Sequence, residues 1–154
     1  MHSGSDSPAV EALEVHLTAF IRAFGLHQVD LTPCGQPLSV SDAHALMDLA
    51  LYGPLAQHEL GQRLYLEKST ISRLVKGLES RGWLVRLPHP SDGRAQLLGL
   101  TDAGAHLAQQ VHTARRLKFV RLLAALNEAE RSAVLAALNT LVEALHATTV
   151  QASH

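Results

Sequence analysis

The stretch from Glu67 to Gly82 reads Glu-Lys-Ser-Thr-Ile-Ser-Arg-Leu-Val-Lys-Gly-Leu-Glu-Ser-Arg-Gly, and its apolar residues follow the period of an α-helix. Gly82 comes after the last charged residues, where a helix often ends in a residue with positive φ. The pattern therefore predicts an amphipathic helix that buries one face and ends near Gly82. Four apolar residues recur at i, i+3, i+4 and i+7 on the buried face, namely Ile71, Leu74, Val75 and Leu78.

The opposite face of this helix combines short hydroxyl side chains with long cations and lacks acidic partners. Such a surface suits the phosphates and base edges of DNA better than it suits plain solvent exposure. We therefore interpret the helix as one that enters DNA. The candidate DNA-binding residues on it are Lys68, Ser69, Thr70, Ser72, Arg73 and Lys76.

A second helix is predicted immediately upstream, over residues 55–64, with Leu55, Leu60 and Leu64 apolar. Two short helices in tandem suggest a helix-turn-helix, in which Gly61 supplies the small residue needed where the helices cross. A generic helical hairpin is the alternative. Downstream, residues 83–87 and 95–100 form two short apolar runs around a polar, turn-rich loop, which predicts a β-hairpin, the wing.

Five segments in this region together resemble the MarR family, the multiple antibiotic resistance regulators. Their order and spacing match over about fifty residues, from Leu55 to Gly104. The segments are Leu55-Ala-Gln-His-Glu-Leu60, Lys68-Ser-Thr-Ile-Ser-Arg-Leu-Val75, Leu78-Glu-Ser-Arg-Gly82, Asp92-Gly-Arg94 and Leu100-Thr-Asp-Ala-Gly104. The resemblance implies a mainly α winged helix-turn-helix with N- and C-terminal dimerisation helices, acting as a homodimeric transcriptional regulator of double-stranded DNA.

Two positions depart from the family pattern. The turn between the two helices usually has glycine where this chain has Tyr65, so a left-handed conformation there costs roughly 1 to 2 kcal/mol. The wing commonly reads Asp-Arg-Arg, whereas here it reads Asp92-Gly93-Arg94 and lacks one cation. Arg94 keeps the position that the resemblance assigns to the minor groove, and Asp92 is expected to aim it.

Composition and charge indicate a single folded unit with a basic module. The 154 residues are 47% hydrophobic, 18% charged and only 4% aromatic, which argues against disorder and predicts an aliphatic core. Residues 55–101 carry seven Lys and Arg against four Asp and Glu, a net +3, while the rest of the chain is −4. A basic module on an acidic body is typical of a DNA-binding protein.

The remaining segments are assigned from proline and glycine residues that interrupt helices, from helix caps, and from the helical spacing of apolar residues. Residues 1–7 are expected to form a flexible tail, and residues 8–54 two supporting helices, the first reaching about residue 30 and the second opening at Ser39. Residues 102–150 are expected to form two helices, begun by Thr101 and by Asn127 with Glu130. Their aliphatic stripes favour dimerisation through both termini, with an intrachain three-helix core as the alternative.

The sequence leaves several regulatory chemistries open. We expect a small aromatic or other organic ligand in a pocket beneath the winged module, with metal sensing as an alternative because the chain has ten histidines. Only His44 and Asp48, at i and i+4, could chelate a metal within one helix. Cys34 is a candidate redox thiol, but its loop has no nearby cation to activate it.

No catalytic motif is apparent in the sequence, and we expect no enzyme activity and no cofactor. A winged helix that serves as a protein-interaction scaffold is the rival from another functional class. The single cysteine and the absence of a signal peptide or a membrane-length apolar run lead us to expect a soluble, cytoplasmic protein.

Overall fold

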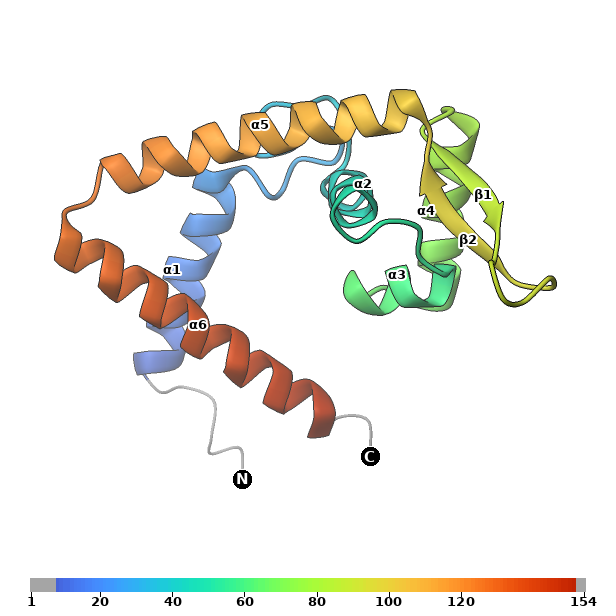
Figure 1. Ribbon diagram of the computed structural model, residues 1–154. Helices are drawn as coiled ribbons and strands as arrows, with labels where there is room; N and C mark the ends of the chain where they lie inside the picture. The colour runs from blue at the N-terminus through green and yellow to red at the C-terminus, as the bar shows by residue number, and fades with distance from the viewer. Residues whose placement is uncertain (1–7, 152–154) are drawn as a thin grey trace. The chain divides into compact units, whose positions relative to one another are not determined.

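The computed structural model describes residues 8–151, which form six helices and one β-hairpin (Figure 1). The chain divides into two compact units, one ending at Arg115 and the other beginning at Arg116. The tail predicted for residues 1–7 lies outside the described residues. The elements are α1 (Pro8–Phe24), α2 (Val40–Tyr52), α3 (Gln57–Arg63), α4 (Lys68–Ser80), β1 (Leu84–Pro88), β2 (Gln96–Leu100), α5 (Asp102–Ala124) and α6 (Glu128–Gln151).

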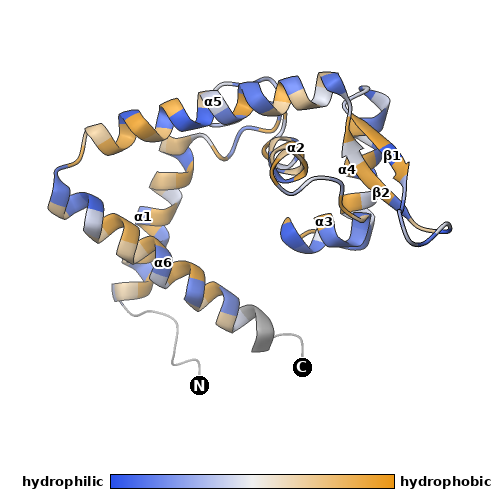
Figure 2. Ribbon diagram, in the orientation of Figure 1, coloured by the Kyte–Doolittle hydropathy of each residue, from blue (hydrophilic) through white to orange (hydrophobic). Residues whose placement is uncertain are grey.

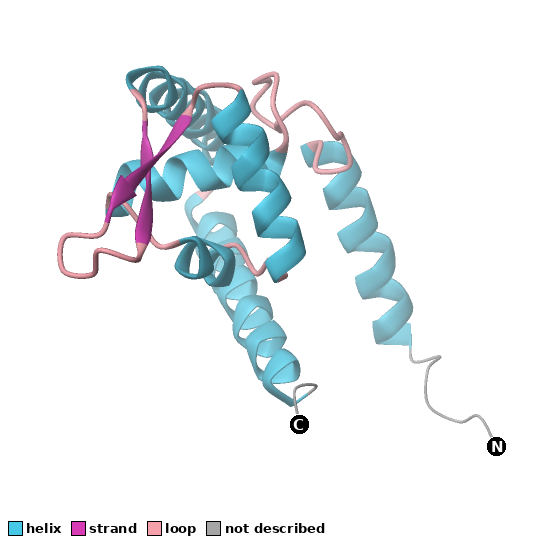
Figure 3. Ribbon diagram, turned by 90° about the vertical axis from the view of Figure 1, so that its right-hand side faces the viewer, coloured by secondary structure: helices cyan, strands magenta, loops and turns pink. Residues whose placement is uncertain are grey.

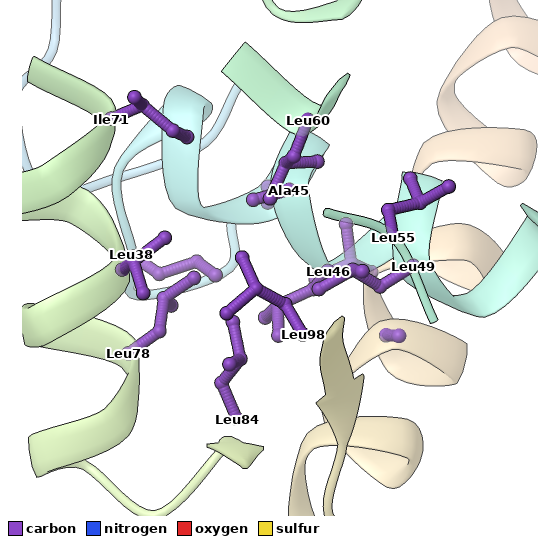
Figure 4. Packing of buried hydrophobic residues seen from close by; sticks show 14 residues of the cluster. Leu38, Ala45, Leu46, Leu49, Leu55, Leu60, Ile71, Leu78, Leu84 and Leu98 are labelled. Carbon is purple, nitrogen blue, oxygen red and sulfur yellow. The ribbon is translucent and has the colours of Figure 1, made fainter. Parts of the chain in front are cut away.

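The core of the first unit is aliphatic, as the composition predicts. Side chains from α2, α3, α4, both strands and the N-terminal half of α5 meet in one cluster (Figure 4). Complete burial of one such side chain contributes about 1.5 to 3 kcal/mol, so this cluster is the main source of stability for the module. Its largest fully buried members are Leu46, Leu60, Leu78, Leu98, Val75 and Val111.

The strands form an antiparallel hairpin in which Leu84 pairs with Leu100. Leu55 adds a single bridge to it, because Leu55 N donates to Leu98 O at 3.1 Å and Leu98 N donates to Leu55 O at 2.7 Å. The prediction that Leu55 begins the upstream helix is therefore wrong. The helix begins two residues later, at Gln57, because the backbone of Leu55 is held by the sheet.

The junction between the hairpin and α5 depends on a threonine and a glycine. Thr101 Oγ1 donates to Gly82 O at 2.6 Å and accepts from Gly104 N at 3.1 Å, so it caps α5 as predicted while tying the helix to the end of α4. A Cβ atom at Gly104 would lie 1.9 Å from the carbonyl oxygen of Trp83. Only glycine permits this approach of helix to backbone.

The other predicted helix starts are also confirmed. Ser39 Oγ accepts from Asp42 N at 3.0 Å at the start of α2. Asn127 and Glu130 form a reciprocal capping box at the start of α6, with hydrogen bonds of 2.8 and 2.9 Å. By contrast α1 ends at Phe24 rather than near residue 30, because Gly25 takes a φ of 93° and closes the helix.

The helices at the two ends of the chain keep their large apolar side chains exposed. Hydrophobic residues recur along α1, α6 and the C-terminal half of α5 (Figure 2). No described residue of α1 is buried. Among the described residues, no helix is long and apolar enough to cross a membrane. The exposed residues include Leu13, Leu17 and Phe20 of α1, Leu117, Val120 and Leu122 of α5, and Leu135, Leu138, Val142 and Leu145 of α6.

We predict that Gly104→Ala destabilises the fold by about 3 kcal/mol, because the new methyl group overlaps backbone that cannot move aside. Gly93→Ala is the matched control, since a Cβ atom there meets nothing within 4 Å. Chemical denaturation measures both variants. Equal stability of the two variants would contradict the packing described at Gly104.

Candidate nucleic-acid interface

Helix α4 buries one face and exposes the other, as its sequence predicts. Ile71 is 3% exposed, and Val75 and Leu78 are fully buried, so the helix cannot rotate without removing these side chains from the core. Gly82, with a φ of 71°, ends the helix as expected. On the other face four of the predicted site residues are exposed, namely Lys68, Ser69, Arg73 and Lys76. The other two, Thr70 and Ser72, are half-buried.

Two other cations of the module are engaged in ion pairs within the chain. Arg81 Nη2 lies 3.0 Å from Asp42 Oδ2, and Arg86 Nε lies 2.8 Å from Glu79 Oε1. Among the described residues neither Arg73 nor Lys76 forms an ion pair. The cations of the exposed face of α4 are therefore available to an external anion, whereas Arg81 and Arg86 join α4 to α2 and to β1.

The loop of the wing is organised by Asp92. Its Oδ1 accepts from Arg94 N at 3.0 Å, and its carbonyl oxygen accepts from Ala95 N at 3.1 Å. His89, which the sequence did not single out, adds to the loop by accepting from Ser91 N at 3.2 Å through Nδ1. Asp92 thus sets the backbone from which the exposed Arg94 side chain projects.

The turn between α3 and α4 brings the two helices close together. A Cβ atom at Gly61 would lie 3.3 Å from Cγ2 of Ile71, so the small residue sits at the helix crossing as predicted. Tyr65 has a φ of 53°, so this position is left-handed although it holds tyrosine in place of glycine. The N-terminal end of α4 and the tip of the wing lie on the same side of the module (Figure 3), because α4 runs antiparallel to β1.

A pocket with a volume of about 520 Å³ lies within the first unit, lined by α2, α3 and the N-terminal half of α5. Its volume suits a small organic molecule. The apolar part of the lining includes Met47, Leu51 and Leu64. The ionisable side chains are His44, Asp48, Arg63, His112 and Arg115.

His44 and Asp48, the candidate metal ligands, both line this pocket. Within residues 8–151 no group of three or more His, Cys, Asp or Glu side chains is arranged to hold a metal ion. Burial lowers the pKa of His44, and the nearby Arg115 guanidinium lowers it further, while Asp48 opposes both. The half-buried Cys34 lies elsewhere, in the loop before α2, with its Sγ 3.1 Å from Thr32 Oγ1.

Comparison with known proteins decides the family. The sequence profile of the MarR family matches residues 38–95. An HTH-type transcriptional regulator of Mycobacterium bovis is 31% identical over 106 residues, which cover 69% of this chain and 74% of that protein. The chain belongs to the MarR family. This MarR-family protein is thus a transcriptional regulator, and its relatives are regulators rather than enzymes.

Solved structures confirm the winged-helix fold of this MarR-family protein. FabT of Streptococcus pneumoniae, solved in complex with DNA, superposes with a TM-score of 0.77 at 18% identity, covering 90% of this chain and 98% of FabT. PcaV of Streptomyces coelicolor, solved with its natural ligand, gives a TM-score of 0.69 at 22% identity, covering 92% of this chain and 99% of PcaV.

We predict that the His44 imidazole titrates below its ordinary pKa, measured by following its ring signals in NMR spectra against pH. Arg115→Gln should raise this pKa and Asp48→Asn should lower it further, because the two charges act on the imidazolium in opposite directions. A raised pKa in wild type, or the same response to both substitutions, would contradict this assignment.

The lowered pKa of His44 also has a consequence for folding stability. The unfolded chain takes up its proton at a higher pH than the folded chain, so the free energy of unfolding falls as pH drops from the ordinary pKa to the lowered one. Above that window His44 causes no loss of stability.

Proposed function

We propose that the protein is a cytoplasmic repressor that binds double-stranded DNA sequence-specifically as a homodimer and is released by a small organic ligand. The observation that carries the proposal is the exposed polar face of α4, held outward by the burial of Ile71, Val75 and Leu78 on the other side. FabT, which shares the fold, was solved bound to DNA, which supports the same use of the module here.

The residues of α4 divide into two roles. Arg73 reads bases in the major groove together with the hydroxyls of Ser69, Thr70 and Ser72, because these side chains share the exposed face near the N-terminal half of the helix. Lys68 and Lys76 neutralise phosphates. In the wing, Arg94 enters the minor groove from a loop that Asp92 holds in shape.

Homodimerisation is supported by the apolar side chains left exposed on the terminal helices. Leu135, Leu138 and Leu145 of α6 are 58%, 49% and 64% exposed, and α1 and the end of α5 carry similar residues. Apolar surface of this extent marks an interaction site. A second copy of the chain is the occupant we propose, with α1, α5 and α6 forming the interface.

Release by a ligand is supported by the pocket in the first unit. Arg63 and Leu64, at the end of α3, line it directly before the turn that leads into α4. A ligand there contacts the helix that positions the DNA-binding helix, and therefore has the means to shift its orientation. PcaV, which shares the fold, was solved with its natural ligand.

Selection of bound sequences from a random duplex pool tests the proposed function. We expect a pseudo-palindrome with half-sites about 10 to 10.5 base pairs apart, because a two-fold dimer places two α4 helices in successive major grooves. Arg73→Ala should relax the consensus, since a bidentate guanidinium contact contributes about 1 to 3 kcal/mol of discrimination. Lys76→Ala is the matched control and should weaken binding to all DNA sequences alike.

Two outcomes would contradict the assignment of α4 as the helix that reads the operator. Recovered sites without two-fold symmetry, or an Arg73→Ala variant that recovers the wild-type consensus with the same stringency, would show that α4 does not read the operator. Failure of wild type to bind any duplex would favour the protein-interaction scaffold instead.

The dimer is tested by replacing Leu138 and Leu145 with Glu. We expect the double variant to sediment as a monomer and to lose DNA binding, because charged side chains oppose burial of α6 against a second copy. Glu143→Gln, on the same helix, is the control. A wild-type protein that remains monomeric at micromolar concentration would contradict the proposal.

A further inference from the structure

A histidine side chain takes part in the hydrogen bonding of the wing loop, which joins β1 to β2 (Figure 1). His89 N donates to Ala95 O at 3.1 Å and closes the base of the loop. The half-buried imidazole accepts from Ser91 N at 3.2 Å through Nδ1. This bond has the form of the turn in which an asparagine or aspartate side chain accepts from the backbone two residues ahead.

The bond from Ser91 N fixes the protonation state of the ring. A backbone N–H can only donate, so Nδ1 of His89 must present its lone pair, and the neutral ring carries its proton on Nε2. Ser91 Oγ also lies 3.2 Å from Nδ1 and can donate to the same lone pair. An imidazolium has hydrogens on both ring nitrogens, so protonation of His89 would set two donors against each other and break the bond.

The same loop carries Arg94, and its two halves are held by different side chains. Asp92 Oδ1 accepts from Arg94 N at 3.0 Å and holds the second half. His89 holds the first half through Ser91, which directly precedes Asp92. Loss of the bond between His89 and Ser91 therefore frees the backbone that leads into the turn from which Arg94 projects.

Few charges surround His89. The other ionisable side chains of the loop are Asp92 and Arg94. On the adjoining strands, β1 carries Arg86, which pairs with Glu79, and β2 carries no ionisable residue. The hydrogen bond from Ser91 N is thus the contact through which a change in the charge of His89 acts on the loop.

We propose that His89 is a positioning residue for DNA binding, whose neutral ring holds the wing loop in the shape that presents Arg94 and whose protonation releases it. The inference rests on the proposed function, because it requires Arg94 to contact DNA. Histidine changes charge between about pH 5 and 8, so operator affinity falls as pH drops through this range. An imidazolium that contacted a phosphate directly would give the opposite sign.

The experiment compares operator affinity at about pH 8 and about pH 5.5, on either side of the range in which histidine takes up a proton, for wild type, His89→Asn and His89→Ala. Asparagine keeps an acceptor near the position of Nδ1 but cannot be protonated, whereas alanine removes the acceptor. At the higher pH, His89→Asn should bind as wild type does and His89→Ala about tenfold more weakly. At the lower pH, wild type should fall about tenfold relative to His89→Asn, because both share the titration of the other histidines.

Two further variants separate positioning from a general effect. In an Arg94→Ala background, His89→Ala should cause no additional loss, because the ring acts through Arg94. His106→Asn is the matched control, since it removes an exposed histidine of α5, and it should keep the pH dependence of wild type.

The state of the ring is read independently of DNA from the nitrogen signals of His89 in NMR spectra at the higher pH, which should show the proton on Nε2. A proton on Nδ1, equal pH dependence in wild type and His89→Asn, or stronger binding by wild type at the lower pH would overturn the inference. So would a full additional loss from His89→Ala in the Arg94→Ala background. A wild-type protein that binds no duplex at either pH would instead overturn the proposed function, and this inference with it.

Discussion

Burial of the apolar face of α4 is the constraint on which the rest of the first unit depends. Ile71, Val75 and Leu78 enter a core shared with α2, α3 and the hairpin, and their removal from water fixes the rotation of α4 about its axis. Because the helix cannot turn, its hydroxyls and cations must face outward. The surface that we propose for DNA is thus a direct consequence of core packing.

Close approaches at two glycines fix the positions of the elements around α4. Gly61 lets α3 approach Ile71, and Gly104 lets α5 approach the carbonyl oxygen of Trp83. The ion pairs Arg81–Asp42 and Arg86–Glu79 then join α4 to its neighbours at the half-exposed surface, where each contributes modestly. These contacts hold α4 and the wing on one side of the module, as a rigid element must be held to read a groove.

The sequence predicted much of this fold because its signals are local. The period of Ile71, Val75 and Leu78 predicted α4, and the positive φ of Gly82 and the caps at Ser39 and Thr101 follow from the chemistry of single residues. The start of α3 was missed because the bridge between Leu55 and Leu98 is non-local and overrides a helical pattern. The role of His89 in the wing was missed because a bond from Ser91 N leaves no periodic signal.

The predicted site residues on α4 and in the wing lie at the surface, but their contacts with DNA stay predictions, since such contacts form only in a complex. The most direct measurement is the affinity of the wild-type protein for duplex DNA as a function of salt. If Lys68, Lys76 and Arg94 of two protomers together neutralise about six phosphates, log affinity should fall against log salt with a slope of about −5. An affinity that does not change with salt would contradict the account.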